Sequence, residues 1–485
     1  MKRISILFAV ASLWFAPAMA QNARSPLQAV HYIKLANTLR EVDKSQESIS
    51  LLLRAMPAVQ SKNLYWEAVT NELLGLSYND IKDTTTALRY LERARTQYTN
   101  LKYVASGWGV NEVIRKISGK NMYAGIQVST TGVQVAIFKT KYESDFYEKE
   151  IKTIVEIPSS PLLYADASNS FKVGQDALRI GLDSIRRYNI PNERIFIVFS
   201  SDVEENLARR TQRRQILYQQ LSQVLPNTTL RIDTTLTPAR EAELFTIGTL
   251  PRKVWATTSA LNLGSTRTEG GYFDKDASRQ NYTNANKAFH EISLPIGVNT
   301  LVSRIEGKRS MNMDAYKREA QRVIKTIADS VFKSNVNSKD LGFQQRRTVG
   351  IGGDIALALV TYLYPDKAGL TAVPISADDA ERFKQAVLSD YKTLIQPNLR
   401  SITNPSVRNR AEKDVSTLQA QVDEKQLVAG ALWLSAVMNS YSSPSSPKRF
   451  VFVRNSGVSW VTGKFLETIN NEYESTIAKG AMYTR

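Results

Sequence analysis

The sequence predicts an α/β protein in which an all-α module precedes a larger part built on a repeated β pattern. Between about residues 27 and 117, apolar residues recur three and four positions apart, which is the period of amphipathic helices. At about residue 119 the pattern changes to that of strands, and a strand–turn–strand unit over 123–138 returns over 257–273. These observations indicate one helical module followed by two α/β lobes.

The composition excludes several classes of chemistry. The 485 residues include no cysteine, which excludes disulfides, thiolate catalysis and thiolate zinc sites. Two histidines cannot build a multi-histidine metal site, and they argue against a Ser-His-Asp hydrolase. The 63 Lys and Arg residues outnumber the 46 Asp and Glu residues, which gives a net charge of +17. This charge either attracts polyanions such as phosphate chains or only keeps the surface solvated, and no specific nucleic-acid partner is predicted.

The densest basic cluster consists of Arg209, Arg210, Arg213 and Arg214. The spacing of four residues places these side chains in pairs on one face of a helix. Such a face can meet phosphates, but a solvated helix face is the interpretation that we favour.

The first 20 residues have the pattern of a secretory signal. A charged start precedes the short apolar run 4–15, and small residues around Ala20 form a cleavage site, so the mature chain is expected to begin at Gln21. A membrane anchor is the competing interpretation, but the run is too short and is followed by Pro17. We therefore expect a periplasmic or extracellular protein with no transmembrane segment in the mature chain.

Residues 21–118 are expected to form helices with the spacing of tetratricopeptide repeats. One copy has its small and large positions at Leu74, Gly75, Tyr78, Ala87, Leu91 and Ala94, and a weaker copy has them at Ala36, Leu39, Ser48, Leu52 and Ala55. Glycine and alanine would let two helices approach closely. The module is interpreted either as a docking surface for a partner protein or as a helical cap on the next domain.

Three turns carry groups that suit an anion. The first turn contains Gln127, Ser129, Thr130, Thr131 and Gly132, and the second contains Asn262, Gly264, Ser265, Thr266, Arg267 and Thr268. Gly352 and Gly353 form the third turn, just before a predicted helix. Backbone N–H groups, hydroxyls and helix N-termini of this kind can hold a phosphate, although any hairpin also needs such residues.

The predicted lobes span residues 119–250 and 251–440, and residues 441–485 form a linker and a C-terminal tail. The tail begins with a Ser/Pro-rich stretch that is typical of linkers. We expect strands over 450–454 and 459–461, and a final helix near 465–477.

The order of these elements resembles the actin-like ATPase superfamily, and within it the exopolyphosphatase and guanosine-pentaphosphatase family. The resemblance covers about residues 120–440. Besides the turns it rests on Glu241-Ala242-Glu243-Leu244 with Gly248, and on Ser293-Leu294-Pro295-Ile296-Gly297. It implies two ribonuclease H-like lobes around a cleft.

The resemblance also implies a chemistry that this chain retains only in part. In that family two loop aspartates hold Mg²⁺ and the phosphate, and a glutamate orients or deprotonates the attacking water. The glutamate matches Glu241, and a loop-end glutamate matches Glu269. The aspartate positions hold Gln127 and Asn262, and an amide lacks the charge that helps to hold Mg²⁺. Ser129 stands where the family has glycine.

Three interpretations follow from these departures. The preferred one is a catalytically degenerate protein that binds a phosphate-bearing ligand, or that acts as an envelope scaffold through its helices. The alternative is a weak phosphoanhydride hydrolase, with Glu241 as base and Mg²⁺ as cofactor, in which Glu269 also takes part. The third is that the turns serve the hairpins alone. Arg267 is expected either to face a phosphate or, by slight preference, to pair with Glu269.

Overall fold

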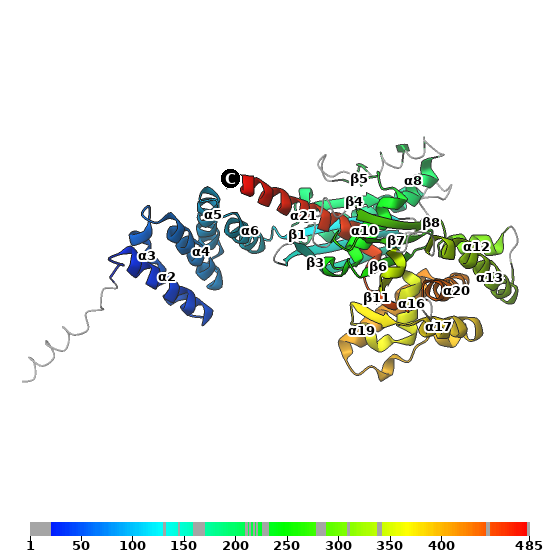
Figure 1. Cartoon of the computed structure of the whole chain (residues 1–485). Helices are drawn as coiled ribbons and strands as arrows, with labels where there is room; N and C mark the ends of the chain where they lie inside the picture. Colours follow the sequence, from blue (N-terminus) through cyan, green and yellow to red (C-terminus); the bar gives the residue numbers. More distant parts are fainter. Residues whose placement is uncertain are drawn as a thin grey trace, which may run out of the picture. The chain divides into compact units, whose positions relative to one another are not determined.

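The computed structural model describes nine stretches of the chain: residues 21–129, 132–143, 146–158, 170–208, 232–277, 288–307, 311–336, 342–442 and 447–482, with scattered positions between 212 and 225. The predicted signal sequence 1–20, Thr130, Thr131 and the basic cluster at 209–214 lie outside the described residues. The chain divides into two compact units, residues 1–121 with 473–485 and residues 122–472. Figure 1 colours both units along the sequence.

The first unit contains the expected helices. They are α2 (Pro26–Glu41), α3 (Ser45–Val59), α4 (Leu64–Asp80), α5 (Thr84–Asn100) and α6 (Val104–Ile117). Side chains of Ser25, Asn63 and Asp83 accept hydrogen bonds from backbone N–H groups that begin α2, α4 and α5. Each helix packs on the next one in the sequence, as Figure 1 shows.

The close helix contact that the sequence predicts at Gly75 is confirmed. A Cβ atom at Gly75 would lie 2.5 Å from Cγ of Leu91, so only glycine lets α4 and α5 approach this closely. The hydroxyls of Ser48 and Ser77 are 3.1 Å apart and join α3 to α4.

The second unit holds two sheets of one design. The first sheet has the order β3-β2-β1-β4-β5, with β1 (Met122–Ser129), β2 (Gly132–Tyr142), β3 (Tyr147–Pro158), β4 (Ile195–Phe199) and β5 (Ile232–Asp233). Strands β1, β2 and β3 are antiparallel, whereas β4 and β5 run parallel to β1. The helices in this part are α7 (Ser170–Arg186), α8 (Ser201–Ala208) and α10 (Pro238–Thr249).

The second sheet repeats this order and adds one edge strand. Its order is β10-β11-β9-β6-β7-β8, with β6 (Thr258–Leu263), β7 (Thr268–Phe273), β8 (Phe289–Leu294), β9 (Thr348–Gly352), β10 (Ala372–Ile375) and β11 (Arg449–Val453). Read from β8, it is again an antiparallel triple followed by the parallel strands β9 and β11. Two sheets with one strand order confirm the expected pair of ribonuclease H-like, actin-like lobes.

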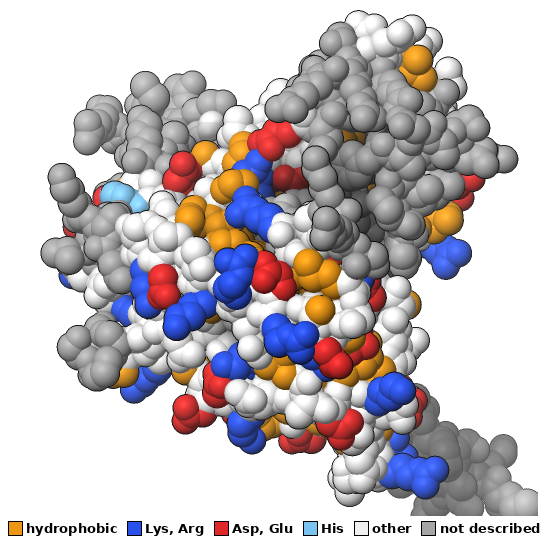
Figure 2. Space-filling model, turned by 90° about the vertical axis from the view of Figure 1, so that its right-hand side faces the viewer, with side chains coloured by type: hydrophobic (Ala, Val, Ile, Leu, Met, Phe, Trp, Pro, Cys, Tyr) orange, Lys and Arg blue, Asp and Glu red, His pale blue; other side chains and the backbone are white. Residues whose placement is uncertain are grey.

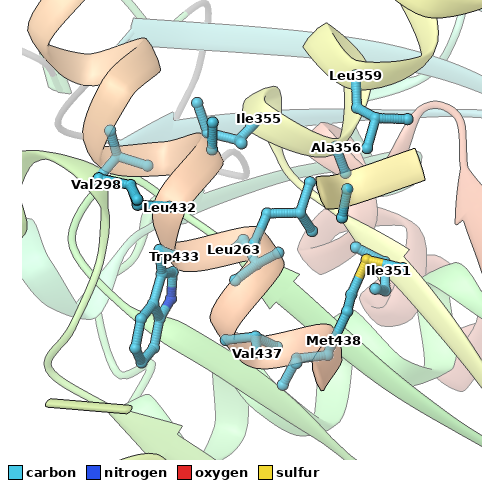
Figure 3. Packing of buried hydrophobic residues seen from close by; sticks show 14 of the residues in the cluster. Leu263, Val298, Ile351, Ile355, Ala356, Leu359, Leu432, Trp433, Val437 and Met438 are labelled. Atoms are coloured by element: carbon cyan, nitrogen blue, oxygen red, sulfur yellow. The ribbon is translucent and has the colours of Figure 1, made fainter. Parts of the chain in front are cut away.

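Helices surround the second sheet. They are α12 (Val298–Glu306), α13 (Met313–Ile327), α14 (Lys333–Val336), α15 (Gly342–Gln345), α16 (Asp354–Leu363), α17 (Ala377–Ser389), α18 (Tyr391–Leu394), α19 (Pro405–Gln421) and α20 (Glu424–Tyr441). The core lies where α20 and α16 meet β6 and β9, and Figure 3 shows Trp433 and Leu432 of α20 beside Ile355 of α16. This core supports the start of β7, because Trp433 Nε1 donates to Thr268 Oγ1 at 2.9 Å.

Two helices cross between the lobes. α10 follows the first sheet but packs on the second, whereas α21 (Ser459–Met482) follows the second sheet and contacts β2 and β3 of the first. Phe465 of α21 stacks on Phe138 of β2 at a ring distance of 5.0 Å. A Cβ atom at Gly248 of α10 would lie 2.1 Å from the carbonyl oxygen of Ser459, so glycine is required where the two helices touch.

The predicted strand over 459–461 is wrong, because α21 begins at Ser459. Three residues are too few to reveal a period. Over a longer window the buried positions Val458, Val461, Phe465 and Ile469 recur every three or four residues, which is the helical period. The strand expected over 450–454 corresponds to β11, which lies between β10 and β9 in the second sheet.

The face shown in Figure 2 carries basic and acidic side chains mixed with one another rather than in a single basic field. Within the described ranges, no helix combines the length and apolar character needed to cross a membrane.

Candidate functional site

A cleft in the second unit lies beside the turns of the β1–β2 and β6–β7 hairpins. Its lining residues are Gln127, Ser129, Gln134, Asp202, Glu241 and Phe245 from the first lobe and α10, Asn262, Gly264, Ser265, Thr266, Arg267, Glu269, Gly353 and Asp354 from the second lobe, and Ser456, Gly457 and Trp460 from the chain around the start of α21. The cavity volume is about 90 Å³, which accommodates several water molecules.

Most of the predicted site residues meet here, but not all of them do. Gly132 and Gly352 end strands and do not line the cavity, and Thr268 is buried under Trp433. The sequence interpretation missed Asp202 and Asp354, although each directly follows a strand end or a glycine turn, where such side chains gather. It also missed the lining residues Gln134, Phe245, Ser456, Gly457 and Trp460, of which the last three come from a part of the chain expected to be a linker and tail.

Glu241 is buried on α10 and bound to the first lobe. Its Oε1 accepts the backbone N–H of Ser201 at 2.5 Å, and its Oε2 lies 2.6 Å from the hydroxyl of Ser201. Burial raises the pKa of Glu241 well above its usual value, and the nearby charge of Glu269 raises it further. Both carboxyl oxygens of the predicted base are therefore engaged with α8, and the protonated form is favoured.

Glu269 forms the buried centre of the cleft. Its Oε1 accepts from Nδ2 of Asn262 at 3.4 Å and from Nε1 of Trp460 at 3.2 Å. Its Oε2 is buried without a hydrogen-bond partner among the described residues. Burial raises the pKa of Glu269 to about 7, a rise that the two donors partly oppose. Asn262 therefore holds a carboxyl group, and an aspartate in its place would set two carboxylates side by side.

Gln127 also faces the C-terminal chain. Because side chains alternate along β1, Ile126 and Val128 face the core under α7, and Gln127 points to the opposite side. Its Nε2 donates to the carbonyl oxygen of Gly457 at 2.7 Å, while its Oε1 is buried without a partner among the described residues. The amide thus joins the first hairpin to the start of α21.

Arg267 does not pair with Glu269, so that expectation is wrong. Its Nε donates to Oδ1 of Asp202 at 3.1 Å, and its Nη2 donates to Glu205 at 2.6 Å. Asp202 also accepts a hydrogen bond from the hydroxyl of Thr266. The partners sit on α8, which the sequence places 62 to 65 residues away from the turn, so no local spacing could indicate them.

In the third turn, too, a backbone N–H group that could bind an anion is hydrogen-bonded to another part of the protein. The backbone N–H of Gly353, the residue just before α16, donates to the hydroxyl of Ser456 at 3.2 Å. Asp354 lines the cleft, and burial raises the pKa of its carboxyl group. The positive φ of 102° at Gly353 explains why glycine is needed at this turn.

The two loop positions offer no carboxylate to Mg²⁺. Within the described residues, no group of three or more His, Asp or Glu side chains is placed to hold a metal ion. At the two loop positions the amides of Gln127 and Asn262 direct N–H groups at Gly457 and Glu269, and an N–H group cannot ligate a cation.

We predict that Glu269→Gln removes a pH-dependent loss of stability. Because the folded state holds the pKa of Glu269 near 7, above that of the unfolded chain, the folded state binds the extra proton between these values. The free energy of unfolding should therefore fall as the pH rises from the ordinary glutamate pKa to about 7, and level off above it. Urea unfolding should show that the variant gains about 2–3 kcal/mol relative to the wild type between pH 4 and pH 8. Equal pH profiles for both proteins would contradict this prediction.

Comparisons with known proteins find distant similarities alone. No family model matches the chain, and no curated protein matches it. Among solved structures, an exopolyphosphatase-like protein is similar at 15% identity and a TM-score of 0.46, covering 71% of this chain and 98% of that one. An exopolyphosphatase from Cytophaga hutchinsonii is similar at 13% identity and a TM-score of 0.44, with the same coverage of both chains. A Ppx/GppA family member from Aquifex aeolicus is similar at 14% identity and 0.42, again over 71% and 98%.

Proposed function

We propose that the protein is an exported, exopolyphosphatase-like protein whose cleft binds a phosphate-bearing ligand without hydrolysing it at an appreciable rate. The observation that carries this proposal is the use of both loop amides inside the protein. The amide of Gln127 donates a hydrogen bond to Gly457, and the amide of Asn262 donates one to Glu269. The two loop positions at which hydrolysis would need carboxylates thus stabilise the walls of the cleft instead.

The charge of the cleft is compatible with an anion despite its four carboxyl groups. A raised pKa favours the neutral form of Glu241, and a pKa of about 7 leaves Glu269 about half protonated near neutral pH. The pKa of Asp354 is also raised by burial, and Arg267 compensates Asp202. A cavity of about 90 Å³ is far below the ~300 Å³ or more of sites that enclose a drug-sized ligand. It suits a phosphoryl group, with the rest of a longer ligand outside.

The alternative is a slow phosphoanhydride hydrolase with Glu241 as base. One observation favours it: Glu269 lines the cleft, burial raises its pKa to about 7, and its buried Oε2 has no hydrogen-bond partner among the described residues. A carboxyl group that titrates near neutral pH can take part in general acid–base chemistry. Against this stands the engagement of both oxygens of Glu241 with Ser201.

We further propose that the first unit is a tetratricopeptide-like module that docks an envelope partner. A hollow of about 410 Å³ lies between α2 and α4 of this unit, lined by Ile33, Lys34, Asn37, Trp66, Val69, Glu72 and Leu73. Export is supported by the signal pattern, and we expect the mature N-terminus to be Gln21. Fractionation of expressing bacteria followed by N-terminal sequencing checks both points, and an intact Met1 in the cytoplasm would contradict them.

The decisive experiment measures binding and phosphate release on the same mature chain. Pyrophosphate and long-chain polyphosphate are titrated by calorimetry, and release is followed with Mg²⁺ or Mn²⁺, with ATP and a guanosine polyphosphate as further substrates. We expect saturable binding with no release above the buffer rate. Release that disappears in Glu241→Gln would establish the hydrolase instead. A folded chain that neither binds the phosphate compounds nor releases phosphate from them would exclude both functions of the cleft, and the scaffold role would remain.

A further inference from the structure

The cleft contains two hydrogen-bond acceptors that no described residue engages. One is Oε2 of Glu269 on β7, and the other is Oε1 of Gln127 on β1. Both residues line the cleft, and they are only 2% and 5% exposed. A buried acceptor without a donor destabilises the protein, so each of these oxygens needs a donor from whatever occupies the cleft.

A fully ionised oxyanion does not supply such a donor. Its oxygens are acceptors alone, and two acceptors repel each other unless a hydrogen lies between them. The amide oxygen of Gln127 does not take up a proton near neutral pH, whereas the carboxyl group of Glu269 can. Because Asn262 and Trp460 engage Oε1 of Glu269, Oε2 is the oxygen that remains for this proton.

The charged groups around Glu269 also leave the cleft short of donors. Glu241 of α10 uses both carboxyl oxygens to hold α8, and Asp354 of α16 is a further carboxyl group in the lining. Among the described residues of the lining, Arg267 is the one cation, and it is paired with Asp202 of α8. A proton on Glu269 would therefore add a donor and remove a negative charge at the same time.

We propose that an oxyanion binds in the cleft together with one proton, which lies between the ligand and Oε2 of Glu269. This inference rests on the proposed binding function and adds its dependence on pH. The proton comes either from the carboxyl group of Glu269 or from the ligand. An oxyanion without a proton can therefore bind only to the protonated carboxyl group, whereas an oxyanion that retains a proton can bind to both forms.

The test compares sulfate with orthophosphate on the full mature chain by calorimetry between about pH 6.5 and 8.5. Sulfate carries no proton in this range, whereas the orthophosphate dianion retains one. Burial raises the pKa of Glu269 to about 7, so sulfate affinity should fall about tenfold for each pH unit above that value. Orthophosphate affinity should fall less than about threefold between pH 7.5 and 8.5, because this ligand brings its own proton.

Three variants assign the proton to one side chain. Glu269→Gln supplies an amide, whose N–H group donates at every pH. We expect its sulfate affinity to be independent of pH above 7.5, and at pH 8.5 to exceed that of the wild type about tenfold or more. Glu193→Gln makes the same change at an exposed residue just before β4 and should retain the wild-type fall. Glu241→Gln alters the neighbouring carboxyl group of the cleft and should also retain the fall. Circular dichroism confirms that each variant is folded.

The outcomes distinguish this inference from the proposed function. If the affinities for sulfate and orthophosphate fall in parallel above pH 7.5, or if the fall for sulfate persists in Glu269→Gln, no proton is shared at Glu269, and the inference is overturned while anion binding stands. Binding of pyrophosphate without binding of either small oxyanion at any pH would also overturn it. If no phosphate compound binds to the folded wild-type chain, the proposed binding function fails and the inference fails with it.

Discussion

Replacement of Trp433 by alanine should lower the free energy of unfolding of the α/β part by about 3–5 kcal/mol, because it removes one of the largest fully buried side chains. The indole lies in the core of the second lobe (Figure 3). It is edge-on to Phe332 at a ring distance of 5.7 Å. Its Nε1 also donates to Thr268, whose hydroxyl in turn donates to the carbonyl oxygen of Ile296. The substitution would leave both a cavity and a buried hydroxyl with one partner fewer.

Trp433→Phe separates these two contributions. It keeps most of the packing but loses the N–H donor, so we expect a cost of about 1–2 kcal/mol. Urea unfolding followed by circular dichroism gives both values. If alanine costs no more than phenylalanine, the packing of Trp433 does not stabilise this lobe, and the core described around α20 is incorrect.

Restoring both aspartates, by Gln127→Asp with Asn262→Asp, should destabilise the protein by about 3–5 kcal/mol in the absence of a divalent cation. An aspartate at 127 would face the carbonyl oxygen of Gly457, and an aspartate at 262 would face Glu269. Each would replace a donor by a charge with no compensating partner. Millimolar Mg²⁺ should recover much of the loss, because the cation would gain two carboxylate ligands.

Thermal unfolding with Mg²⁺ and with EDTA measures this effect. Gln321→Glu with Asn439→Asp also replaces two amides by carboxylates, at two exposed positions of the second lobe, and should leave stability within about 0.5 kcal/mol of the wild type, with or without Mg²⁺. A restored pair that is as stable as the wild type in EDTA would show that the amides are not needed to hold the cleft, and would remove the main support for a degenerate site.

The local patterns of the sequence predicted both the helices of the first unit and the β hairpins of the second. The helices of the first unit follow from apolar spacing, and the β1–β2 and β6–β7 hairpins follow from alternation around polar turns. The repetition of one strand–turn–strand unit was enough to indicate two lobes of one design. These features depend on residues close together in the chain, so a short window contains the whole signal.

The candidate site was predictable only in part. The turns supplied eight of the seventeen lining residues, including Gln127, Asn262 and Arg267. Their partners were not predictable, because Arg267 binds α8 rather than the neighbouring Glu269. The choice between these carboxylates depends on where β4 and α8 come to lie, and no residue near the turn carries that information.

The sequence by itself determined the helical module, the duplicated β pattern and the amides at the two loop positions. Only the tertiary structure decided what these groups do. It brings Gly457 to Gln127 across 330 residues and Trp460 to Glu269 across 191 residues, because α21 crosses back to the first sheet. Contacts over such separations leave no period in the sequence, and the burial that they create sets the charge of the cleft.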